Sequence, residues 1–486
     1  NALVRNNIVG TNSNGDELGN GWNGIFVWSG NGANVQGNTV VNNGIGSSHD
    51  IRFMPDRISG IRFQEVTSGT IHQNYVGTDA NKIDAGNAFD GITLHTNATG
   101  VTITENIICN NGFKANEKYG EQGGGGIAIR NCSGNNVEIV SNFIGVHEDD
   151  SDGGNKDYGI SIEGASNVTV GGDDVVKGNK IGYTKNVRNV SMNHRGCGIW
   201  IVGSTCQAVP TSSKDNEVYF NQIFNNGGNG IQIENSATNN IIGALGKGNT
   251  FLRNEYGIMV TSSGAIENTL RFNSFSCNTS GGISLQNGGN EEYGNAGSPK
   301  SIIISTDEPR VNYISGFAPS ANAKVDIYGR DACFLDCTDS ASQGITWVDS
   351  VIAAPTASSS GLYKWEYDFV SGGNKVNKNT AIVLATEAGA AGSVNTSEFS
   401  VCVFECDTPK NSQVNPLDFN LCPGENAALR AEYSGKLSTG YTYDWYIRLV
   451  DSDSLVHSVV DDSTYSTGTG GEYFVIISNV TDPISC

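Results

Sequence analysis

The stretch NVEIVSNFIGVHEDDSDGGNKDYGISIE, residues 136–163, holds one full unit of a pattern that recurs through the first 290 residues. Its NFIG segment is an Asn, a variable residue and an apolar residue, and its GISI segment is a Gly-Ile pair, a variable residue and an apolar residue. Each segment occurs nine times, and successive asparagines are 24 to 42 residues apart. Two interleaved short-strand patterns at one shared period indicate a solenoid. The asparagines are Asn7, Asn38, Asn74, Asn106, Asn142, Asn179, Asn221, Asn249 and Asn273, and the glycines are Gly24, Gly60, Gly91, Gly126, Gly159, Gly198, Gly230, Gly257 and Gly282.

The residues within each unit indicate which solenoid it is. After each glycine the first and third residues are apolar while the second varies, which is the period of a strand with one buried face. A third strand-like segment, such as 101–103 or 136–139, lies between the other two. Three short strands per turn, joined by Gly, Asn, Asp and Ser corners, predict an all-β chain that begins with a right-handed parallel β-helix of about nine coils over residues 1–290. At about 4.8 Å per coil the rod is on the order of 43 Å long.

An asparagine at one fixed corner of every coil can stack on its equivalent in the next coil. Side-chain amides stacked in this way bond in a ladder, as they do in cross-β assemblies. The predicted structural ladder comprises Asn38, Asn74, Asn106, Asn142, Asn179 and Asn221.

The repeat ends after Gly282, and the Gly/Asn/Pro-rich stretch 287–299 indicates a linker. Seven strand-like runs between residues 301 and 404 predict an immunoglobulin-like β-sandwich at 300–406. A second sandwich of immunoglobulin or PKD type is expected at 409–486, with Trp445 as its core aromatic residue.

Composition restricts the partners of the chain. The 29 Lys and Arg residues against 50 Asp and Glu residues give a formal net charge of −21, which disfavours binding to nucleic acid. No apolar run of 18 residues occurs, so the sequence predicts no membrane span. The chain starts at Asn1 without an initiator Met or a signal peptide, and we expect it to be a processed or partial product.

The eleven cysteines favour disulfides over metal sites, since the CFLDC and CVFEC pairs have no histidine nearby. Such bonds imply an extracellular or cell-surface location. We expect Cys422 to pair with Cys486, with Cys197–Cys206 and Cys109–Cys132 as further candidates and Cys277 left over as a small buried apolar residue.

Several motifs carry a resemblance to a known group of proteins. The VGT…LGNG and YVGT…AGN segments within 9–21 and 75–87 resemble the β-helix repeats of large secreted bacterial surface proteins. The segments 314–316, 325–328 and 395–399 are similar to the sandwich that follows such helices. The segment from LCPG at 421–424 to Cys486 resembles the Ig/PKD-like repeats of Bacteroidota proteins exported by the type IX pathway. The resemblance implies cell-surface export and, for most such proteins, an adhesive role.

The outward-facing side chains of the Gly-Ile strands are the first candidates for a catalytic or binding site. Arg62, His95 and Arg130 would grip a sugar carboxylate there, with an arginine as base and a neutralising cation. Trp28 and Trp200 would serve as carbohydrate-stacking platforms. The alternative is a solvated face with an ordinary mixture of side chains.

A series of acidic corners offers a second candidate site. An acidic residue, a variable residue, Gly and Asn recur at 17–20, 84–87 and 152–155. Carboxylates at these corners, Asp84, Asp149 and Asp152 among them, are candidate ligands for Ca²⁺. The alternative is a solvated corner, and the sequence indicates no other cofactor.

Two functions follow from these observations. The first is an extracellular structural or adhesive protein, a stalk, adhesin or filament subunit without catalytic activity, whose partners are other surface chains, copies of itself or glycans. The second is a secreted polysaccharide lyase or hydrolase that acts on an acidic glycan along the β-helix. The open strand edges of the first coil suggest head-to-tail assembly, while the linker after residue 286 would cap the last coil.

Overall fold

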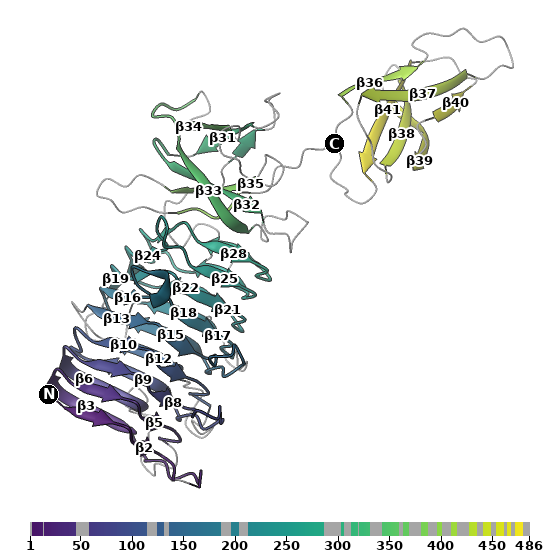
Figure 1. Ribbon diagram of the computed structural model, residues 1–486. Helices are drawn as coiled ribbons and strands as arrows, with labels where there is room; N and C mark the ends of the chain where they lie inside the picture. The colour runs from purple at the N-terminus through teal and green to yellow at the C-terminus, as the bar shows by residue number, and fades with distance from the viewer. Residues whose placement is uncertain are drawn as a thin grey trace. The chain divides into compact units, whose positions relative to one another are not determined.

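The computed structural model describes most of the repeat region and the strands that follow it (Figure 1). The described residues are 2–12, 14–44, 58–113, 124–130, 136–185, 196–203, 212–285, 303–305, 313–318, 320–330, 343–358, 363–368, 381–386, 396–400, 410–415, 427–434, 441–448, 453–460, 464–467 and 472–479. The chain divides into two compact units, Asn1–Val403 and Phe404–Cys486, which are described separately. Among these described residues, no helix is long and apolar enough to cross a membrane.

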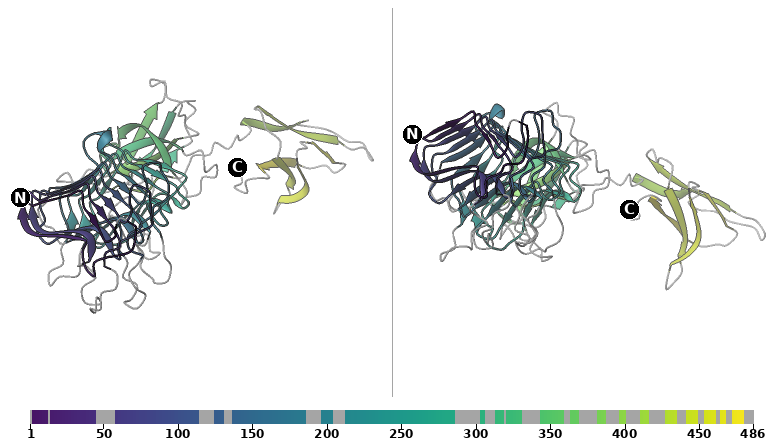
Figure 2. Two further views of the ribbon diagram at one scale, coloured as in Figure 1. Left: turned by 60° about the horizontal axis from the view of Figure 1, so that its bottom comes forward. Right: turned by 90° about the horizontal axis from the view of Figure 1, so that it is seen from below.

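Three parallel sheets of nine strands build the first unit, and the coils lie one over another (Figures 1 and 2). Sheet 1 contains β1 (Leu3–Arg5), β4 (Asn34–Gln36), β7 (Thr70–His72), β10 (Thr102–Thr104), β13 (Val137–Val140), β16 (Val168–Val170), β20 (Glu217–Val218), β24 (Ile241–Ile242) and β27 (Thr269–Leu270). Sheet 2 contains β2 (Ile8–Val9), β5 (Thr39–Val40), β8 (Tyr75–Val76), β11 (Ile107–Ile108), β14 (Phe143–Ile144), β17 (Lys180–Gly182), β21 (Gln222–Phe224), β25 (Thr250–Leu252) and β28 (Ser274–Ser276). Sheet 3 contains β3 (Ile25–Asn31), β6 (Ser59–Thr67), β9 (Asp90–His95), β12 (Ile127–Arg130), β15 (Tyr158–Glu163), β18 (Cys197–Val202), β22 (Ile231–Glu234), β26 (Tyr256–Val260) and β29 (Gly281–Leu285). The predicted right-handed parallel β-helix of nine coils is confirmed.

Two minor elements lie outside the three long sheets. The short strands β19 (Ser213–Lys214) and β23 (Ala237–Thr238) pair in parallel, and the 3₁₀ turn η4 (Val175–Lys177) lies between β16 and β17. Neither interrupts the register of the three long sheets.

Columns of aliphatic side chains fill the interior of the helix. Equivalent residues of consecutive coils are paired in register, as Ile92, Ile127 and Ile160 are in sheet 3. All three are fully buried. Burial of apolar area at about 25 cal/mol per Å² makes these columns the main favourable term in the stability of the rod.

The motif asparagines form a continuous ladder at the corner between sheets 1 and 2. The backbone N and Nδ2 of Asn38 both donate to Oδ1 of Asn74, at 2.9 and 3.0 Å. Asn74 donates in the same way to Asn106, and Asn142 to Asn179. The ladder runs from Asn7 through Asn38, Asn74, Asn106, Asn142, Asn179, Asn221 and Asn249 to Asn273.

The same amides hold a sharp turn of the backbone. The residue before the ladder asparagine is left-handed in several coils, with φ of 55° at Gln73 and Glu105 and 56° at Ser141. A non-glycine residue in this region costs roughly 1–2 kcal/mol. Nδ2 of Asn142 donates to the carbonyl of Val140 at 2.9 Å, so the buried side chain closes the turn on the residue two positions earlier.

A second ladder, at the corner between sheets 2 and 3, was not predicted. Asn43 donates to Asn87, Asn87 to Asn111 and Asn111 to Asn155, with Nδ2 to Oδ1 distances of 2.9 to 3.1 Å. Asn20 and Asn43 make the first rung of this ladder. Further along the stack, Asn226, Asn254 and Asn278 continue the same corner.

Close packing at this corner explains the recurring glycine before each sheet 3 isoleucine. A Cβ on Gly91 would lie 2.8 Å from the carbonyl oxygen of Gly126 in the next coil and 2.8 Å from Nδ2 of Asn111. Real Cβ atoms do not approach other atoms so closely, so only glycine fits.

Two three-stranded antiparallel sheets follow the helix within the first unit. One has the strand order β30 (Ile303–Ser305), β31 (Tyr313–Ala318), β34 (Tyr363–Asp368), and the other β33 (Gly344–Ile352), β32 (Lys324–Arg330), β35 (Ala381–Thr386). Trp365, Ile314, Val325 and Val383 from both sheets share one buried cluster, so the pair forms a β-sandwich. The described part of the seventh predicted run lies beside β35, since the backbone N–H groups of Ser397 and Ser400 donate to carbonyls of that strand.

The sandwich covers the open end of the last coil. Thr396 Oγ1 accepts from the backbone N of Leu270 at 3.0 Å, and Tyr328 OH from that of Phe272 at 2.8 Å. Gln343 Oε1 accepts from both N and Nδ2 of Asn278 at 2.9 Å, so a glutamine supplies the next rung of the second ladder.

The interior of the helix also continues into the sandwich. Phe275 of the last coil stacks on Phe251 at 5.0 Å, and Phe399 packs edge-on against Phe275 at 5.5 Å and against Tyr328 at 5.3 Å. One hydrophobic core therefore joins the last coil and the sandwich. The sequence assigned the capping role to the linker at 287–299, which lies outside the described residues.

The last coil was expected to be capped, and the described cap is the sandwich. Its side chains accept hydrogen bonds from the backbone N–H groups of Leu270, Phe272 and Asn278. An end-to-end stack of coils through that end would have to displace the sandwich. The predicted boundary at 290–300 separates helix strands from sandwich strands, whereas the compact unit extends to Val403.

The cysteines differ from the sequence expectation. Cys109 and Cys197 are buried free thiols. The Sγ of Cys197 donates to Gln232 Oε1 at 3.4 Å, and burial raises its pKa well above the ordinary value. The predicted pairs Cys197–Cys206 and Cys109–Cys132 are therefore wrong, although Cys206 and Cys132 themselves lie outside the described residues. Cys277, expected to be unpaired, is disulfide-bonded.

The second unit also contains two three-stranded antiparallel sheets. Their orders are β36 (Lys410–Asn415), β37 (Ala427–Ser434), β40 (Thr464–Thr467) and β39 (Asp453–Val460), β38 (Tyr441–Arg448), β41 (Glu472–Asn479). Trp445 is fully buried, as predicted, and its ring lies 5.9 Å from that of Tyr465 in the other sheet. The predicted Cys422–Cys486 bond lies outside the described residues.

The ladder predicts a graded loss of stability along the stack. Asn142→Ala removes an amide that bonds to both neighbouring coils and leaves buried partners unsatisfied, so we expect a loss of about 1–3 kcal/mol. Asn273→Ala should cost less, because that amide accepts from Asn249 but has no further rung beyond it. Denaturant unfolding measures both, and an Asn142 variant as stable as the parent chain contradicts the prediction.

The contact between the last coil and the sandwich predicts a larger loss of stability than the ladder does. Arg271 holds Asp326 through two bonds of 2.5 Å, and both side chains are buried. Asp326→Ala leaves the guanidinium buried without its carboxylate, which costs about 3–5 kcal/mol. The double variant Arg271→Met, Asp326→Leu should recover most of that loss, and Asp173→Ala at an exposed pair should change little. Equal thermal shifts for Asp326→Ala and Asp173→Ala would rule out the role of this pair.

Candidate functional site

Two columns of outward-facing side chains run along sheet 3, the Gly-Ile sheet. Pairing in register places Phe26 beside Arg62 and Arg62 beside Thr93, and in the adjacent column Trp28 beside Gln64 and Gln64 beside His95. The second column continues to Arg130 and Glu163. The sequence therefore predicted correctly which residues share this face.

Exposure along these columns is uneven. Phe26 is 47% exposed and Trp28 63%, whereas Thr93 is 1% exposed and Ser161 and Gln232 are fully buried. Thr93, Ser161 and Gln232 of the inner coils are therefore not solvated, whereas Arg130 and Glu163 in the other column are partly exposed. Among the described residues of this face, the large exposed aromatic side chains belong to the first coil.

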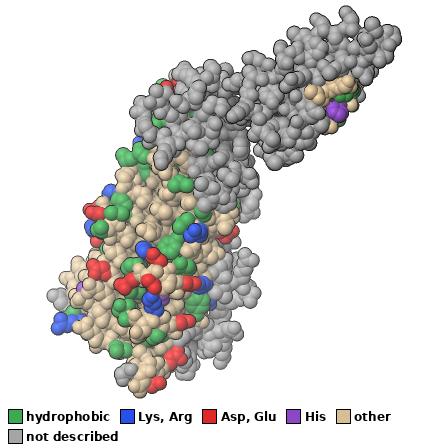
Figure 3. Space-filling model, turned by 45° about the vertical axis from the view of Figure 1, so that its right-hand side comes forward, with side chains coloured by type: hydrophobic (Ala, Val, Ile, Leu, Met, Phe, Trp, Pro, Cys, Tyr) green, Lys and Arg blue, Asp and Glu red, His purple; other side chains and the backbone are tan. Residues whose placement is uncertain are grey.

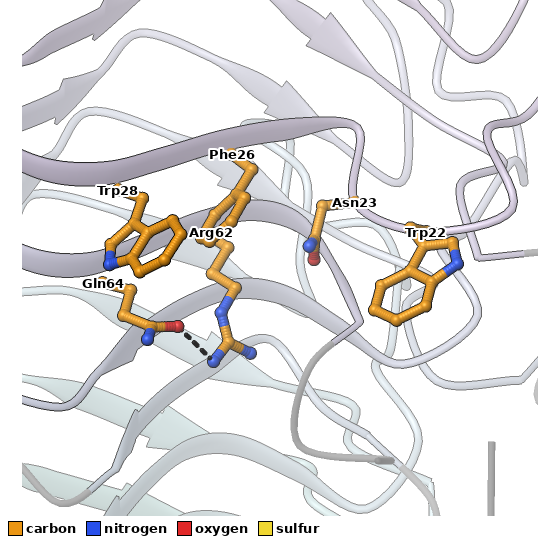
Figure 4. A pocket seen from close by; sticks show the side chains of 6 residues that line it. All are labelled: Trp22, Asn23, Phe26, Trp28, Arg62 and Gln64. Atoms are coloured by element: carbon orange, nitrogen blue, oxygen red, sulfur yellow. Dashed lines mark hydrogen bonds between the residues drawn. The ribbon is translucent and has the colours of Figure 1, made fainter.

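An open pocket of about 330 Å³ lies against the first two coils. It is lined by Trp22, Asn23, Phe26, Trp28, Arg62 and Gln64 (Figure 4). The first four residues come from β3 and the turn before it, and the last two from β6. The volume is at the lower end of the range for small-molecule sites, so the pocket fits a short segment of a ligand.

The aromatic side chains shape this pocket. Phe26 and Trp28 are alternate residues of one strand, and their rings lie nearly parallel, 14° apart with centroids separated by 6.4 Å. In Figure 4 Trp22 lies apart from this pair, with Asn23 between them. The Phe26–Trp28 pair therefore forms one apolar surface of the pocket, and the ring of Trp22 forms a second surface apart from it.

Polar groups line the same space. Arg62 is 2% exposed, its guanidinium lies 5.9 Å from the centroid of Phe26, and its Nη2 donates to Gln64 Oε1 at 3.0 Å (Figure 4). The Oδ1 of Asn23 accepts from the backbone N of Ser59 at 2.7 Å, which fixes the orientation of that amide. Amides held by such bonds are suited to orient a polar ligand.

A buried ionic network occupies the middle coils. Arg130 donates to Asp90 Oδ2 at 2.7 Å, to Glu163 Oε1 at 3.1 Å and to Tyr158 OH at 2.8 Å. Tyr158 OH donates to the other oxygen of Asp90 at 2.7 Å. Burial works to lower the pKa of Arg130, but Asp90 and Glu163 outweigh it and raise the pKa well above its ordinary value.

The remaining predicted site residues lie outside the pocket lining. His95 Nδ1 lies 2.5 Å from Thr96 Oγ1. Trp200 donates from Nε1 to Glu234 at 2.9 Å, and its ring is tilted against that of Tyr158 at 6.2 Å. Trp200 is thus part of a polar network several coils from Trp28.

The acidic corners carry ion pairs. Asp149 bonds to Lys82 and Asp152 to Lys185, while Asp150 lies 2.6 Å from Lys180. The bond from Lys82 lowers the pKa of Asp149. Figure 3 shows one face of the coils on which acidic and basic side chains lie next to one another.

No group of three His, Cys, Asp or Glu side chains within the described part of the chain is placed to hold a metal ion. The candidates Asp84, Asp149 and Asp152 are therefore not brought together as a ligand set. The recurrence of acidic residue, variable residue, Gly and Asn has another cause, since Asn20, Asn87 and Asn155 are rungs of the second ladder.

Sequence reasoning missed four residues of these sites, namely Trp22, Asn23, Asp90 and Tyr158. Trp22 precedes the Gly-Ile segment and falls outside its pattern. Asp90 and Tyr158 occupy the position directly before the Gly-Ile glycine of their coils. A comparison of that position across coils would have drawn attention to them, because it varies in chemistry from Ser59 to Asp90, Tyr158 and Cys197.

Comparison with known proteins adds little to these observations. No family model matches the chain, and no curated protein matches it. A solved structure of XylC with xylose is 10% identical over 71% of this chain, with a TM-score of 0.24, and the matched part spans 62% of the XylC chain. The tailspike protein of Acinetobacter baumannii phage AM24 is 12% identical over 83% of this chain and 74% of its own, with a TM-score of 0.13. Likenesses this slight do not bear on function.

The ionic network predicts a dependence of stability on alkaline pH. Burial raises the pKa of Tyr158 well above its ordinary value of 10.0, so the folded chain keeps this phenol protonated where the unfolded chain loses the proton. Stability from this group is complete below pH 10 and falls as the pH rises further, by about 1.4 kcal/mol per pH unit. Tyr158→Phe should reduce that slope in denaturant unfolding measured from pH 9 upward, and an unchanged slope contradicts the assignment.

Proposed function

We propose that this chain is an extracellular adhesive protein whose β-helix is a rigid support for a glycan-binding site. The site is the pocket between Trp22, Phe26, Trp28, Arg62 and Gln64 on the first two coils. The chain has no catalytic activity of its own in this proposal.

The observation that supports it is the exposed aromatic pair. Phe26 and Trp28 present nearly parallel rings to solvent, although large apolar side chains are normally buried. One face of a pyranose ring consists of C–H groups, and it packs well on a flat aromatic surface. Its hydroxyl groups at the rim need hydrogen-bond partners, and the amides of Asn23 and Gln64 supply them in this proposal.

The arrangement of the arginines disfavours the lyase alternative. A general base must release its proton near neutral pH. The pKa of Arg130 is raised, and its guanidinium is held by two carboxylates and a phenol. Arg62 bonds to Gln64 and lies over Phe26, while His95 contacts Thr96. These contacts disfavour a role for the three residues as one catalytic group.

The cell-surface location and the adhesive role belong to this proposal. A rigid stack of nine coils suits a stalk, because a ladder at two corners and one continuous core resist bending. The two sandwiches serve as spacers or as docking modules for other surface chains. Export by a secretion pathway that delivers chains to the bacterial surface is consistent with the sequence resemblance.

A glycan array followed by titration calorimetry tests this function. We expect the parent chain to bind a polysaccharide, and Trp28→Ala to weaken that binding about tenfold, since loss of one stacking ring removes on the order of 1.4 kcal/mol. Leu3→Ala is the matched control, because Leu3 is 58% exposed on the same coil and does not line the pocket.

Three results would contradict the proposal. The first is no binding to any glycan on the array. The second is an equal loss for Trp28→Ala and Leu3→Ala. The third is production of unsaturated or shortened sugars when the chain is incubated with its ligand.

A further inference from the structure

The charge around the pocket restricts what kind of glycan it can hold. Arg62 is the one charged side chain among the six lining residues. Its Nη2 is bonded to Gln64 and its guanidinium lies over the ring of Phe26. The whole Arg62 side chain is only 2% exposed, so its guanidinium is held within the protein and offers little surface to an anionic ligand.

Within the described residues, the charge on the neighbouring coils of this face is balanced. His95 lies beside Gln64 in the next coil and is followed in that column by Arg130, whose charge is matched by Asp90 and Glu163. The chain as a whole carries a formal charge of −21. A polyanion is repelled by such a field, and its approach is slowed.

The aromatic surfaces restrict the ligand's length. Phe26 and Trp28 lie side by side with centroids 6.4 Å apart, and Trp22 stands on the other side of Asn23 (Figure 4). A single sugar ring covers one of these surfaces at a time. A ligand that contacts both the Phe26–Trp28 pair and Trp22 must therefore provide consecutive sugar units of one chain.

We propose that the ligand is a neutral polysaccharide, a run of consecutive uncharged pyranose units of which one stacks on the Phe26–Trp28 pair and the next contacts Trp22. The inference rests on the proposed glycan-binding function and specifies its ligand class. The amides of Asn23 and Gln64 orient the hydroxyl groups, and Arg62 holds the side chain of Gln64 in place.

Titration calorimetry with the full chain separates neutral from acidic ligands. The neutral probes are oligosaccharides of glucan, mannan and xylan, and the acidic probes are oligogalacturonate and alginate fragments, each at low and at physiological salt. We expect a neutral series to bind with an affinity that increases from one to several sugar units and does not change with salt. Trp28→Ala and Trp22→Ala should each weaken it about tenfold, while Leu3→Ala should not.

A pair of substitutions at Arg62 tests the role of its charge. Arg62→Lys keeps the positive charge but loses the planar donor that bonds to Gln64. Arg62→Gln loses both. If Arg62 acts by holding Gln64, the two variants weaken neutral-glycan binding by similar factors.

The outcomes distinguish this inference from the function on which it rests. Preferential, salt-sensitive binding of the acidic series, retained by Arg62→Lys and lost by Arg62→Gln, overturns the neutral ligand and leaves glycan binding intact. Affinity for a single sugar equal to that for the longer chain overturns the claim of consecutive units. Failure of both series to bind overturns the proposed function itself.

Discussion

The hydrogen bond from one buried asparagine amide to the asparagine one coil later is the interaction on which the rest of this structure depends. Each coil has to turn sharply between sheets 1 and 2, and the residue before Asn74, Gln73, adopts a left-handed conformation to do so. The amide of Asn74 accepts from Asn38, donates to Asn106, and donates to the carbonyl of His72 in its own turn. A polar group in the core is costly unless every bond is made, and stacking in register makes every bond. The ladder therefore fixes register and coil geometry together.

The register of sheet 3 then determines which side chains lie beside one another on its outer face. Because Trp28 is paired with Gln64, and Gln64 with His95, side chains distant in sequence share one column. The sequence allowed this to be predicted from the Gly-Ile segments alone, since period-two alternation assigns each side chain to a face. It did not allow the exposure of each position to be predicted. Thr93 and Phe26 occupy the same column, yet one is buried and the other half exposed, and no local pattern distinguishes them.

The acidic motif that suggested a Ca²⁺ site also arises from an asparagine ladder. The acidic corners recur two coils apart because Asn20, Asn87 and Asn155 are rungs of the second ladder, with Asn43 and Asn111 on the coils between. The structural residue of that motif is the asparagine, while the acids next to it form ion pairs with lysines such as Lys82 and Lys185. The sandwich cap was beyond prediction for a different reason. Gln343, Thr396 and Tyr328 are far from the last coil in sequence, and nothing in their local context marks them as partners of its backbone.

The cap also explains why the proposed site lies where it does. At the last coil, the backbone N–H groups of Leu270 and Phe272 donate to the sandwich, and Phe399 extends the hydrophobic core. The residues at that end therefore stabilise the fold. In the middle coils Arg130, Asp90 and Glu163 satisfy one another and leave a closed network. The first two coils carry the pocket instead. Aromatic rings that would be buried elsewhere stay exposed there beside amides with fixed orientation, and this combination is what a binding site for an uncharged sugar chain requires.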